Sequence, residues 1–530
     1  MGLAITVMLL VSAVSTLPAG EVIWRGPGDD GIYSTISVSD IDGDTSPEVI
    51  SAIYYGGTPS DPRKVYCLSG RTGDTIWVNR SAYGTWGNKG LDNAGDLNND
   101  GIDDIVLGTV GTYIPPGRSC IAIDGETGEN LWVFPFGQDR GWCYSVRAFT
   151  APGGSPVDLD HDGIPEVLAA AGGLTTDRRG TAIALSGASG DSLWAFRPAY
   201  DGAQCIAPFV DVDGDTIPEV LVGAGGNGLD NRAFCLSGRD GSLVWAYTTA
   251  GSVSDIERLP DVNRSGTDDV ICGGWAYRVY CLEGATGDSI WVTSLGGSSI
   301  VMELVPIRDV NADGIDDVVV GSWSSSVHIL SGGDGTTLWS GYVGSDVWSV
   351  DTLADVDGDD VPEVIAGCLG GGNGAIKVFS GASGTELWGH EFVERVYDVT
   401  GVPDLNADGS PDVVVALQDH GNDPYHVYAF NGILPSALAE STEPPHPKLT
   451  GVSIVGRPEL RLTVPTRGIW RLLLLDAAGR RVGSVLTGVG PVYDKPVSVD
   501  KLIPTNGLVF ARLEIETAGT KVLKLIVARN

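Results

Sequence analysis

The stretch Asp40-Ile41-Asp42-Gly43-Asp44-Thr45-Ser46-Pro47-Glu48, followed at once by Val49-Ile50, decides the fold of this 530-residue chain. Oxygen-bearing side chains stand at positions 1, 3, 5 and 9 of this acidic loop, and β-branched residues follow it. The loop recurs at intervals of 46 to 62 residues, beginning at Asp96, Asp158, Asp211, Asp261, Asp309, Asp355 and Asp404. A period of about 50 residues with several strands per unit is typical of a β-propeller. The repeat therefore predicts an all-β propeller.

Each loop has the composition of a calcium site. Ca²⁺ takes six to eight oxygens at roughly 2.3–2.6 Å, and nine residues supply them only if the chain turns tightly. A glycine at position 4 or 6, such as Gly43 or Gly101, permits that turn. The last acid falls at position 9 and a strand follows, whereas an EF-hand needs a glutamate at position 12 and a helix. We therefore predict β-hairpin loops that bind structural calcium.

The predicted ligands are the residues at positions 1, 3, 5, 7 and 9, where position 7 offers its backbone carbonyl. They are Asp40, Asp42, Asp44, Ser46 and Glu48; Asp96, Asn98, Asp100, Ile102 and Asp104; Asp158, Asp160, Asp162, Ile164 and Glu166; Asp211, Asp213, Asp215, Ile217 and Glu219; Asp261, Asn263, Ser265 and Asp269; Asp309, Asn311, Asp313, Ile315 and Asp317; Asp355, Asp357, Asp359, Val361 and Glu363; and Asp404, Asn406, Asp408, Ser410 and Asp412. The fifth loop has Ser265 at position 5 beside Arg264, so we expect it to bind weakly. A metal-free Asp- and Gly-rich turn is the alternative for any single loop, but eight copies with one oxygen spacing favour calcium.

The charge of the chain agrees with bound cations. The formal net charge is −35, and 27 of the 68 acidic residues stand at loop positions 1, 3, 5 and 9. Without a cation, each loop crowds two to four carboxylates together, and they repel one another. A Kd of ~0.1 mM in ~1 mM calcium would stabilise the fold by about 1.4 kcal/mol per site. We expect up to eight structural calcium ions, and we expect chelation to lower the melting temperature.

A second motif lies between the loops. It first reads Cys67-Leu68-Ser69-Gly70-Arg71-Thr72-Gly73-Asp74-Thr75-Ile76-Trp77, and its later copies end at Trp132, Trp194, Trp245, Trp291, Trp339 and Trp388. Each copy predicts a strand, a tight glycine turn and an outer strand whose tryptophan packs between blades. Residues 21–24 look like an outer strand without its partners, and residues 426–430 look like a third strand without an outer one. Pairing of these two fragments would close a ring of eight blades and remove its open edges.

The tryptophan motif resembles the repeat of quinoprotein-dehydrogenase-like (PQQ-like) propellers. The acidic loops resemble the FG-GAP or VCBS repeats of integrin α-subunits and many bacterial surface proteins. The two resemblances together cover residues 21–434, and they imply an eight-bladed, calcium-binding propeller. Quinone-dependent dehydrogenases of this fold often use adjacent cysteines near the cofactor, and this sequence has no Cys-Cys pair. The spacing of its eight cysteines leaves Cys143–Cys205 and Cys272–Cys281 disulfides open.

The two ends of the chain differ from the repeats. Residues 1–20 hold a short apolar run that fits a secretory signal and is too short for a comfortable membrane span, with an uncleaved anchor as the alternative. Residues 435–448 form a Pro-rich linker, and residues 449–530 predict a small β-sandwich. Residues 446–530 hold 13 Lys and Arg against 6 Asp and Glu.

The C-terminal segment carries a second resemblance. Residues 476–482, 506–513 and 524–529 resemble C-terminal sorting domains of the type IX secretion system and related FlgD-like Ig modules. That resemblance implies export and attachment at the bacterial cell surface, and a simple accessory sandwich is the alternative. With the apolar N-terminal run, it predicts a secreted or surface-attached protein.

A candidate ligand face lies on the connections opposite the calcium loops. These connections are longest in the first three blades, where they carry the aromatic residues Tyr54, Tyr55, Trp86, Tyr113, Trp142 and Tyr144. Aromatic side chains on long loops over a rigid scaffold are typical of a binding surface. The alternative is that part of this cluster simply covers the centre of the propeller.

Catalytic motifs are scarce. The six histidines are scattered, and neither HExxH nor GxSxG occurs. We therefore predict a non-catalytic binding, adhesion or surface-assembly protein, whose partner is a protein, a glycan or another copy of itself. We expect no nucleic acid partner and no transmembrane span in the mature chain. The enzymatic alternative is a polysaccharide lyase or other carbohydrate-active enzyme acting at the aromatic loop face. A quinone-dependent dehydrogenase is a third, weaker hypothesis.

Overall fold

The computed structural model divides the chain into two compact units, Leu17–Leu434 and a second unit of Met1–Thr16 with Pro435–Asn530. It describes residues 19–432 apart from gaps at 28–30, 54–63, 81–83, 87–88, 112–116, 138–140, 173–179, 200, 227–229, 298, 371–373 and 419–424. Outside that range it describes only strands, which lie within residues 5–8 and 448–529. Each unit is considered by itself.

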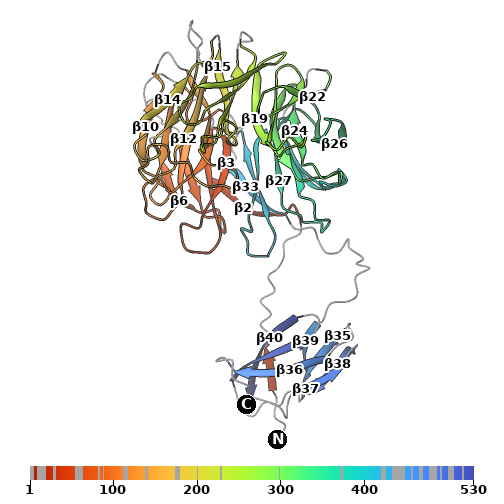
Figure 1. Ribbon diagram of the computed structural model, residues 1–530. Helices are drawn as coiled ribbons and strands as arrows, with labels where there is room; N and C mark the ends of the chain where they lie inside the picture. The colour runs from red at the N-terminus through yellow and green to blue at the C-terminus, as the bar shows by residue number, and fades with distance from the viewer. Residues whose placement is uncertain are drawn as a thin grey trace. The chain divides into compact units, whose positions relative to one another are not determined.

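The larger unit is built from eight four-stranded antiparallel sheets, the blades, whose strands we call A to D from the inside outward. Blades 1 to 4 hold β3 (Ile32–Val38), β4 (Glu48–Ile53), β5 (Val65–Leu68), β6 (Thr75–Asn79); β7 (Leu91–Gly95), β8 (Asp104–Gly108), β9 (Ser119–Ile123), β10 (Asn130–Pro135); β11 (Trp142–Ala148), β12 (Val167–Gly172), β13 (Thr181–Leu185), β14 (Ser192–Phe196); and β15 (Gly202–Pro208), β16 (Val220–Gly225), β17 (Arg232–Leu236), β18 (Leu243–Thr248). Blades 5 to 8 hold β19 (Val253–Leu259), β20 (Asp269–Gly274), β21 (Arg278–Leu282), β22 (Ser289–Ser294); β23 (Val301–Ile307), β24 (Asp317–Ser322), β25 (Ser326–Leu330), β26 (Thr337–Tyr342); β27 (Val347–Leu353), β28 (Glu363–Cys368), β29 (Ala375–Phe379), β30 (Glu386–Glu391); and β31 (Val396–Val402), β32 (Asp412–Leu417), β33 (Tyr425–Asn431), β2 (Val22–Pro27). Strands β3, β19 and β27 lie toward the centre of the ring, and β6, β10, β22 and β26 lie at its rim (Figure 1).

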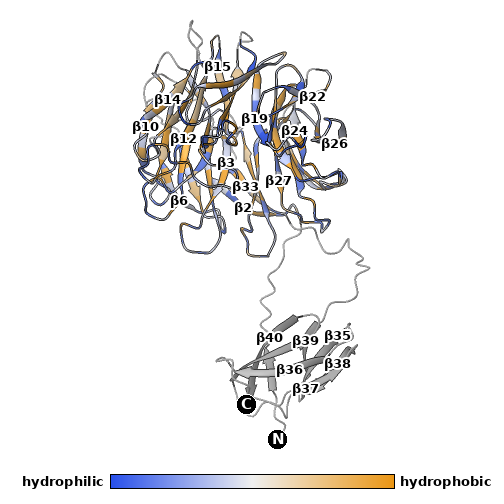
Figure 2. Ribbon diagram, in the orientation of Figure 1, coloured by the Kyte–Doolittle hydropathy of each residue, from blue (hydrophilic) through white to orange (hydrophobic). Residues whose placement is uncertain are grey.

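The β-branched run after each acidic loop forms strand B, which is buried on both faces because neighbouring blades cover it. In β12 and β32, for example, every residue is buried. Strand D is buried on one face only: in β18, Trp245 points inward, whereas Leu243, Ala246 and Thr248 are exposed. Hydrophobic residues accordingly follow the strands of this unit, and hydrophilic residues gather in the connecting loops (Figure 2).

The chain closes the ring with its own N-terminal strand. β2 pairs antiparallel with β33, and the register places Val22 opposite Phe430 and Trp24 opposite Ala429. Blade 8 therefore combines segments about 400 residues apart in the sequence. The predicted fold class, an all-β eight-bladed propeller, is confirmed.

A seam of tryptophans joins consecutive blades. Seven indole Nε1–H groups donate to the carbonyl of the turn glycine in the next blade, at 2.6–2.8 Å, namely those of Trp24, Trp77, Trp132, Trp194, Trp245, Trp291 and Trp339. The next glycine of that turn must lack a side chain, because a Cβ on Gly128 would lie 2.5 Å from the ring of Trp77. Gly128 also has a φ of 73°, which glycine adopts without strain. The eighth tryptophan, Trp388, stacks on Gly20 in the same way.

The second unit is described only as strands. It holds β1 (Ile5–Met8), β34 (Lys448–Ile454), β35 (Arg457–Val464), β36 (Ile469–Asp476), β37 (Leu486–Val489), β38 (Val492–Ser498), β39 (Gly507–Ile515) and β40 (Gly519–Arg529). They form a five-stranded sheet, β1-β40-β39-β36-β37, and a three-stranded sheet, β34-β35-β38. Most of the expected signal segment and residues 435–447 of the expected linker lie outside the described residues.

Candidate functional site

The eight acidic loops connect strands A and B, and they share one backbone conformation. Positions 4 and 6 both have left-handed φ angles in every loop, for example 81° at Gly43 and 76° at Thr45. One of the two positions is always glycine, and the other is Thr, Asn, His, Arg, Asp or Ala. The fifth loop follows the same rule, with φ 62° at Arg264 and 96° at Gly266. The sequence identified only one of these two turns per loop.

This conformation turns the side-chain oxygens of a loop toward one point. In the second loop, the Asp96 carboxylate accepts the backbone N–H groups of Asp100 at 3.2 Å and Gly101 at 2.9 Å. Four loops bring at least three carboxylate oxygens within 4.8 Å of one another; they contain Asp40, Asp42, Asp44 and Glu48, then Asp158, Asp160 and Glu166, then Asp211, Asp213 and Glu219, and finally Asp355, Asp357 and Asp359. Each of the other four loops has Asn at position 3 in place of an acid.

The acid at position 9 is buried in all eight loops, with 0–1% of its surface exposed. It ties the loop to its own blade, as when Glu166 accepts the N–H groups of Leu159 at 2.6 Å and Gly187 at 3.2 Å. Burial raises the pKa of Glu166, Glu219 and Glu363 to about 7. Glu219 Oε2 is buried and has no hydrogen-bond partner among the described residues. Buried hard oxygens of this kind fit a calcium ion, whose charge would offset the cost of burying the carboxylate.

The fifth loop gains an acid that the loop sequence does not contain. Glu283 lies in the C–D turn of the same blade, and its carboxylate accepts hydrogen bonds from Ser265 Oγ at 2.9 Å and from the Asn263 amide. Asp124 stands at the equivalent place in blade 2, where it accepts a hydrogen bond from Asn98 at 3.1 Å. These two acids lie next to loops that have fewer than four acids of their own.

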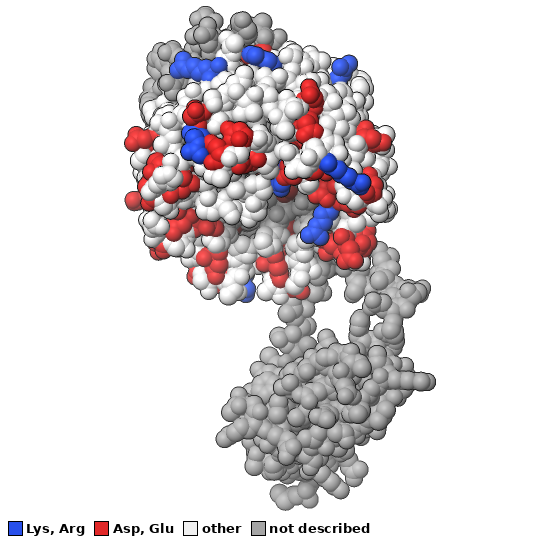
Figure 3. All heavy atoms as spheres, viewed as in Figure 1, with Lys and Arg blue, Asp and Glu red and all other residues white. Residues whose placement is uncertain are grey.

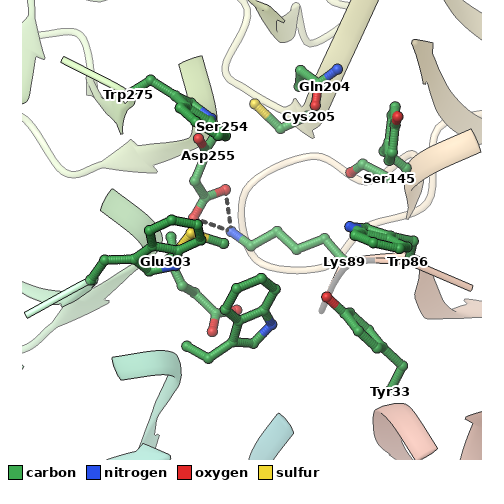
Figure 4. A pocket seen from close by; sticks show the side chains of 14 residues that line it. Tyr33, Trp86, Lys89, Ser145, Gln204, Cys205, Ser254, Asp255, Trp275 and Glu303 are labelled. Carbon is green, nitrogen blue, oxygen red and sulfur yellow. Dashed lines mark hydrogen bonds and ion pairs between the residues drawn. The ribbon is translucent and has the colours of Figure 1, made fainter. Parts of the chain in front are cut away.

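A pocket of about 330 Å³ lies on the axis of the propeller, at the inner strands (Figure 4). Its walls combine aromatic rings with polar and charged groups, contributed by Tyr33, Trp86, Lys89, Tyr144, Ser145, Gln204, Cys205, Ser254, Asp255, Trp275, Met302, Glu303, Trp323 and Trp348. This mixture of apolar surface and a few converging polar groups is typical of ligand sites.

Irregularities in the A strands place many of these side chains. Seven of the eight A–B pairs shift register by one residue near the start of strand A, and the extra residues are Tyr33, Tyr144, Gln204, Ser254, Met302, Trp348 and Tyr397. All of these except Tyr397 line the pocket. A β-bulge redirects a side chain in this way, and bulges are frequent next to functional sites. In blade 2, Lys89 and Trp86 come from the connection that precedes β7.

Eight aromatic rings form a continuous arc around the axis. Trp275, Trp323, Trp348, Tyr397, Tyr33, Trp86, Trp142 and Tyr144 follow one another with centroids 4.5–6.1 Å apart. Trp275 at one end of the arc is 55% exposed, although it is a large apolar residue. Ser145, Ser254 and Trp323 also line the pocket, and their Oγ and Nε1 atoms are buried without a hydrogen-bond partner among the described residues. Six of the eight rings in the arc line the pocket.

A network of charged side chains lies at the pocket. Lys89 reaches across it, and its Nζ donates to Asp255 Oδ1 at 2.6 Å, to Oδ2 at 2.7 Å and to Glu257 (Figure 4). Burial lowers the pKa of Lys89, but the carboxylates of Asp255 and Glu257 outweigh burial and raise it above its usual value. Arg147 also lies near Glu257, at 3.5 Å.

Carboxylates around the axis also join neighbouring blades at five of the eight junctions. Glu303 in blade 6 accepts the N–H of Val350 in blade 7 at 2.9 Å. In the same way Asp92 accepts from Ala148, Asp255 from Leu304, Asp351 from Gly401 and Asp398 from Thr35. Burial, with a contribution from Glu303, raises the pKa of Asp398 well above its usual value, and burial raises that of Asp351 to about 6.

The predicted ligand residues are only partly described. Trp86, Trp142 and Tyr144 lie together in the aromatic arc. Tyr54, Tyr55 and Tyr113 lie outside the described residues. The other arc residues were not predicted, although the sequence holds a positional signal for several residues of the arc and the pocket. Tyr33 stands seven positions before Asp40, the first aspartate of its loop. Six other pocket or arc residues stand at the same position relative to their own loops, namely Lys89, Gln204, Ser254, Met302, Trp348 and Tyr397.

The cysteines are all unpaired thiols. All eight are free and buried, so neither Cys143–Cys205 nor Cys272–Cys281 forms a disulfide. They fill space in the blades, as buried cysteine commonly does. Among the described segments, none forms a helix of the length and hydrophobicity that a membrane crossing requires.

Comparisons with known proteins agree with the architecture. Residues 117–340 match the PQQ_2 family model, described as outer membrane protein assembly factor BamB, which supports the PQQ-like resemblance over that range. No curated protein matches the chain. The computationally designed Ika8 protein is 15% identical with a TM-score of 0.53, over 78% of this chain and 100% of that one.

Two natural proteins have similar structures. Sqt1 of Saccharomyces cerevisiae is 10% identical with a TM-score of 0.53, over 78% of this chain and 99% of that one. The quinohemoprotein alcohol dehydrogenase ADHIIG from Pseudomonas putida HK5 is 14% identical with a TM-score of 0.51, over 84% of this chain and 81% of that one. At these identities the likeness shows the β-propeller fold alone.

Proposed function

We propose that this protein is an exported, calcium-stabilised β-propeller that acts as a non-catalytic binding protein and takes its ligand in the axial pocket. The observation that carries the proposal is the arc of eight aromatic rings around a pocket of about 330 Å³. These rings are separate from the eight tryptophans that fill the seams between blades, and two of them, Tyr33 and Tyr397, are themselves buried.

The exposed state of Trp275 supports ligand binding. A tryptophan that is 55% exposed leaves much of its apolar surface in water. Covering that apolar surface with a ligand would be favourable. Trp275 lines the pocket beside Trp323, with ring centroids 6.0 Å apart, so a ligand in the pocket would cover both.

Calcium is the second part of the proposal. Eight loops share one backbone and a buried acid at position 9, and four of them bring at least three carboxylate oxygens within 4.8 Å of one another. Glu219 Oε2, buried without a hydrogen-bond partner among the described residues, supports cation binding independently of the acidic composition. The ions would hold the A–B connections, so their role would be structural. Weak calcium sites need the calcium concentrations found outside the cytosol, which fits the apolar N-terminal run.

The test measures binding to a panel of neutral oligosaccharides, acidic oligosaccharides, peptides and small amines by calorimetry, with calcium present. The variant Trp275→Ala removes a ring whose exposure makes it a small contributor to the core. The matched control is Tyr342→Ala, which removes another exposed ring, 63% exposed, on the outer strand β26. We expect at least one class of probe to bind with a loss of tenfold or more in Trp275→Ala and no change in Tyr342→Ala.

Two other results would contradict the proposal. The pocket is not the ligand site if every probe that binds does so equally well to wild type and Trp275→Ala. Release of unsaturated or shortened products from an oligosaccharide would support the lyase alternative instead.

A further inference from the structure

We infer that the ligand of the axial pocket is an organic cation, carrying an alkylammonium, quaternary ammonium or guanidinium group. This inference rests on the proposed function, because it assigns a ligand class to the same pocket. It requires a site that is rich in ring faces, negatively charged, and large enough for a group of this size.

The ring faces supply the first part of such a site. The face of an aromatic ring carries negative potential, so a cation within about 6 Å of the centroid is attracted to it. Four tryptophans and two tyrosines line the pocket. Trp323 and Trp348 stack with an interplanar angle of 24°, and Trp275 follows at 56°. Differently inclined faces around one space suit a rounded cation better than a single flat ring.

The charges supply the second part. The ionisable groups of the pocket wall are one cation, Lys89, and two carboxylates, Asp255 and Glu303. Next to them, Arg147 adds one further cation and Glu257, 3.5 Å from it, adds one further carboxylate. Burial raises the pKa of Asp92, Asp351 and Asp398, so these three acids near the axis add less negative charge. Low-dielectric walls strengthen the attraction of this excess negative charge for an incoming cation.

Lys89 shows that the pocket already binds an ammonium group. Its Nζ is held by both oxygens of Asp255, and its side chain crosses the pocket near Trp86 and Tyr33 (Figure 4). Lys89 therefore occupies one cation position, at Asp255, and we expect an incoming cation to lie between Glu303 and the tryptophans that line the same pocket. Removing the Lys89 charge should open the position at Asp255 to the ligand.

The surface charge disfavours the opposite class of ligand. The chain outside residues 446–530 holds 62 Asp and Glu against 20 Lys and Arg. Acidic residues predominate on the propeller face shown in Figure 3. An acidic polysaccharide would be repelled by such a surface, whereas cations would be concentrated near it.

The test compares choline with 3,3-dimethyl-1-butanol, which has the same shape but carbon in place of the charged nitrogen. Both are titrated into the full-length calcium-loaded protein by calorimetry, with n-butylguanidinium as a second cation. We expect choline or n-butylguanidinium to bind at least tenfold more tightly than the neutral isostere. Trp275→Ala should abolish this binding, and Tyr342→Ala should leave it unchanged.

Charge variants separate attraction by the carboxylate from stacking alone. Glu303→Gln retains an oxygen that can accept the Val350 N–H, but it removes the negative charge. We expect it to weaken cation binding at least fivefold and to leave the weak binding of the isostere unchanged. Lys89→Met retains the side-chain length and should strengthen cation binding. If Lys89→Met fails to fold, Glu303→Gln alone decides the question.

The outcomes distinguish this inference from the proposed function. Equal binding of choline and its isostere would overturn the cation class and leave the pocket as the site. The same conclusion would follow if only neutral oligosaccharides bound and Trp275→Ala weakened their binding. Failure of the whole panel to respond to Trp275→Ala would overturn both.

The cation could belong to a free small molecule or to a Lys or Arg side chain of a second copy, whose residues 446–530 are basic. Sedimentation of the full chain separates these sources. Self-association that choline disperses would identify a second copy as the source, and a monomer that binds choline would identify a free amine. Self-association that ignores choline, with no choline binding, would contradict the inference.

Discussion

Substitution of a seam tryptophan by phenylalanine should destabilise the propeller by an amount that depends on its indole hydrogen bond. Trp194 is 7% exposed, and its Nε1 donates to the Gly238 carbonyl of the next blade at 2.7 Å. Trp194→Phe removes that donor and leaves the carbonyl without it in a buried seam. Losing a buried hydrogen bond in this way costs about 1–3 kcal/mol, in addition to the packing lost with the smaller ring.

The chain offers a matched control. Trp388 is 8% exposed and packs on Gly20 like the other seam tryptophans, but its Nε1 has no hydrogen-bond partner among the described residues. Trp388→Phe should therefore lose only packing. With an unfolding entropy near 2.1 cal/mol/K per residue over roughly 400 residues, the difference in melting temperature between the variants corresponds to about 1–4 °C. Calorimetric melting of both variants in the same calcium buffer measures it. Equal melting temperatures would refute the role of the hydrogen bond.

Two further predictions concern the axis and the turns. Burial raises the pKa of Asp351 from 3.8 to about 6, so the free energy of unfolding should fall by up to about 3 kcal/mol as pH rises from about 4 to 7 and this carboxyl ionises. Urea unfolding of Asp351→Asn should therefore show a flatter pH dependence than that of the wild type. Parallel curves for the two proteins would contradict the raised pKa of Asp351. Gly128 and Gly137 have similar φ angles, 73° and 72°. In Gly128→Ala the new Cβ would lie 2.5 Å from the ring of Trp77, whereas in Gly137→Ala it would meet nothing within 4 Å. Urea unfolding should show Gly128→Ala to be less stable by a further ~1–3 kcal/mol, and equal losses would place the whole cost in the backbone.

The repeat made most of the fold predictable. The eight acidic loops, of which the first spans Asp40 to Glu48, predicted the number of blades, because each loop precedes a buried strand B. The tryptophan motif gave the C–D hairpins, and the incomplete fragments at residues 21–24 and 426–430 predicted the strand pair that closes the ring. These features could be predicted because the same sequence pattern and the same packing recur in every blade.

The axial pocket could not be predicted in the same way. Its residues stand at one repeated position, but they are Tyr33, Lys89, Gln204, Ser254 and others that share no chemical property. A binding site needs different groups on different blades, so repetition does not reveal it. The A-strand bulges that turn these side chains inward depend on register between strands, which a single sequence does not specify.

Calcium occupancy of the loops tests the account most directly. Crystals grown with ~5 mM calcium should show anomalous difference peaks in the acidic loops, each ringed by the oxygens of positions 1, 3, 5, 7 and 9 at roughly 2.3–2.6 Å. Occupied loops would account for the uniform backbone at Gly43, Gly101 and their equivalents. An eight-bladed ring whose loops contained only water under these conditions would contradict the calcium-stabilised propeller.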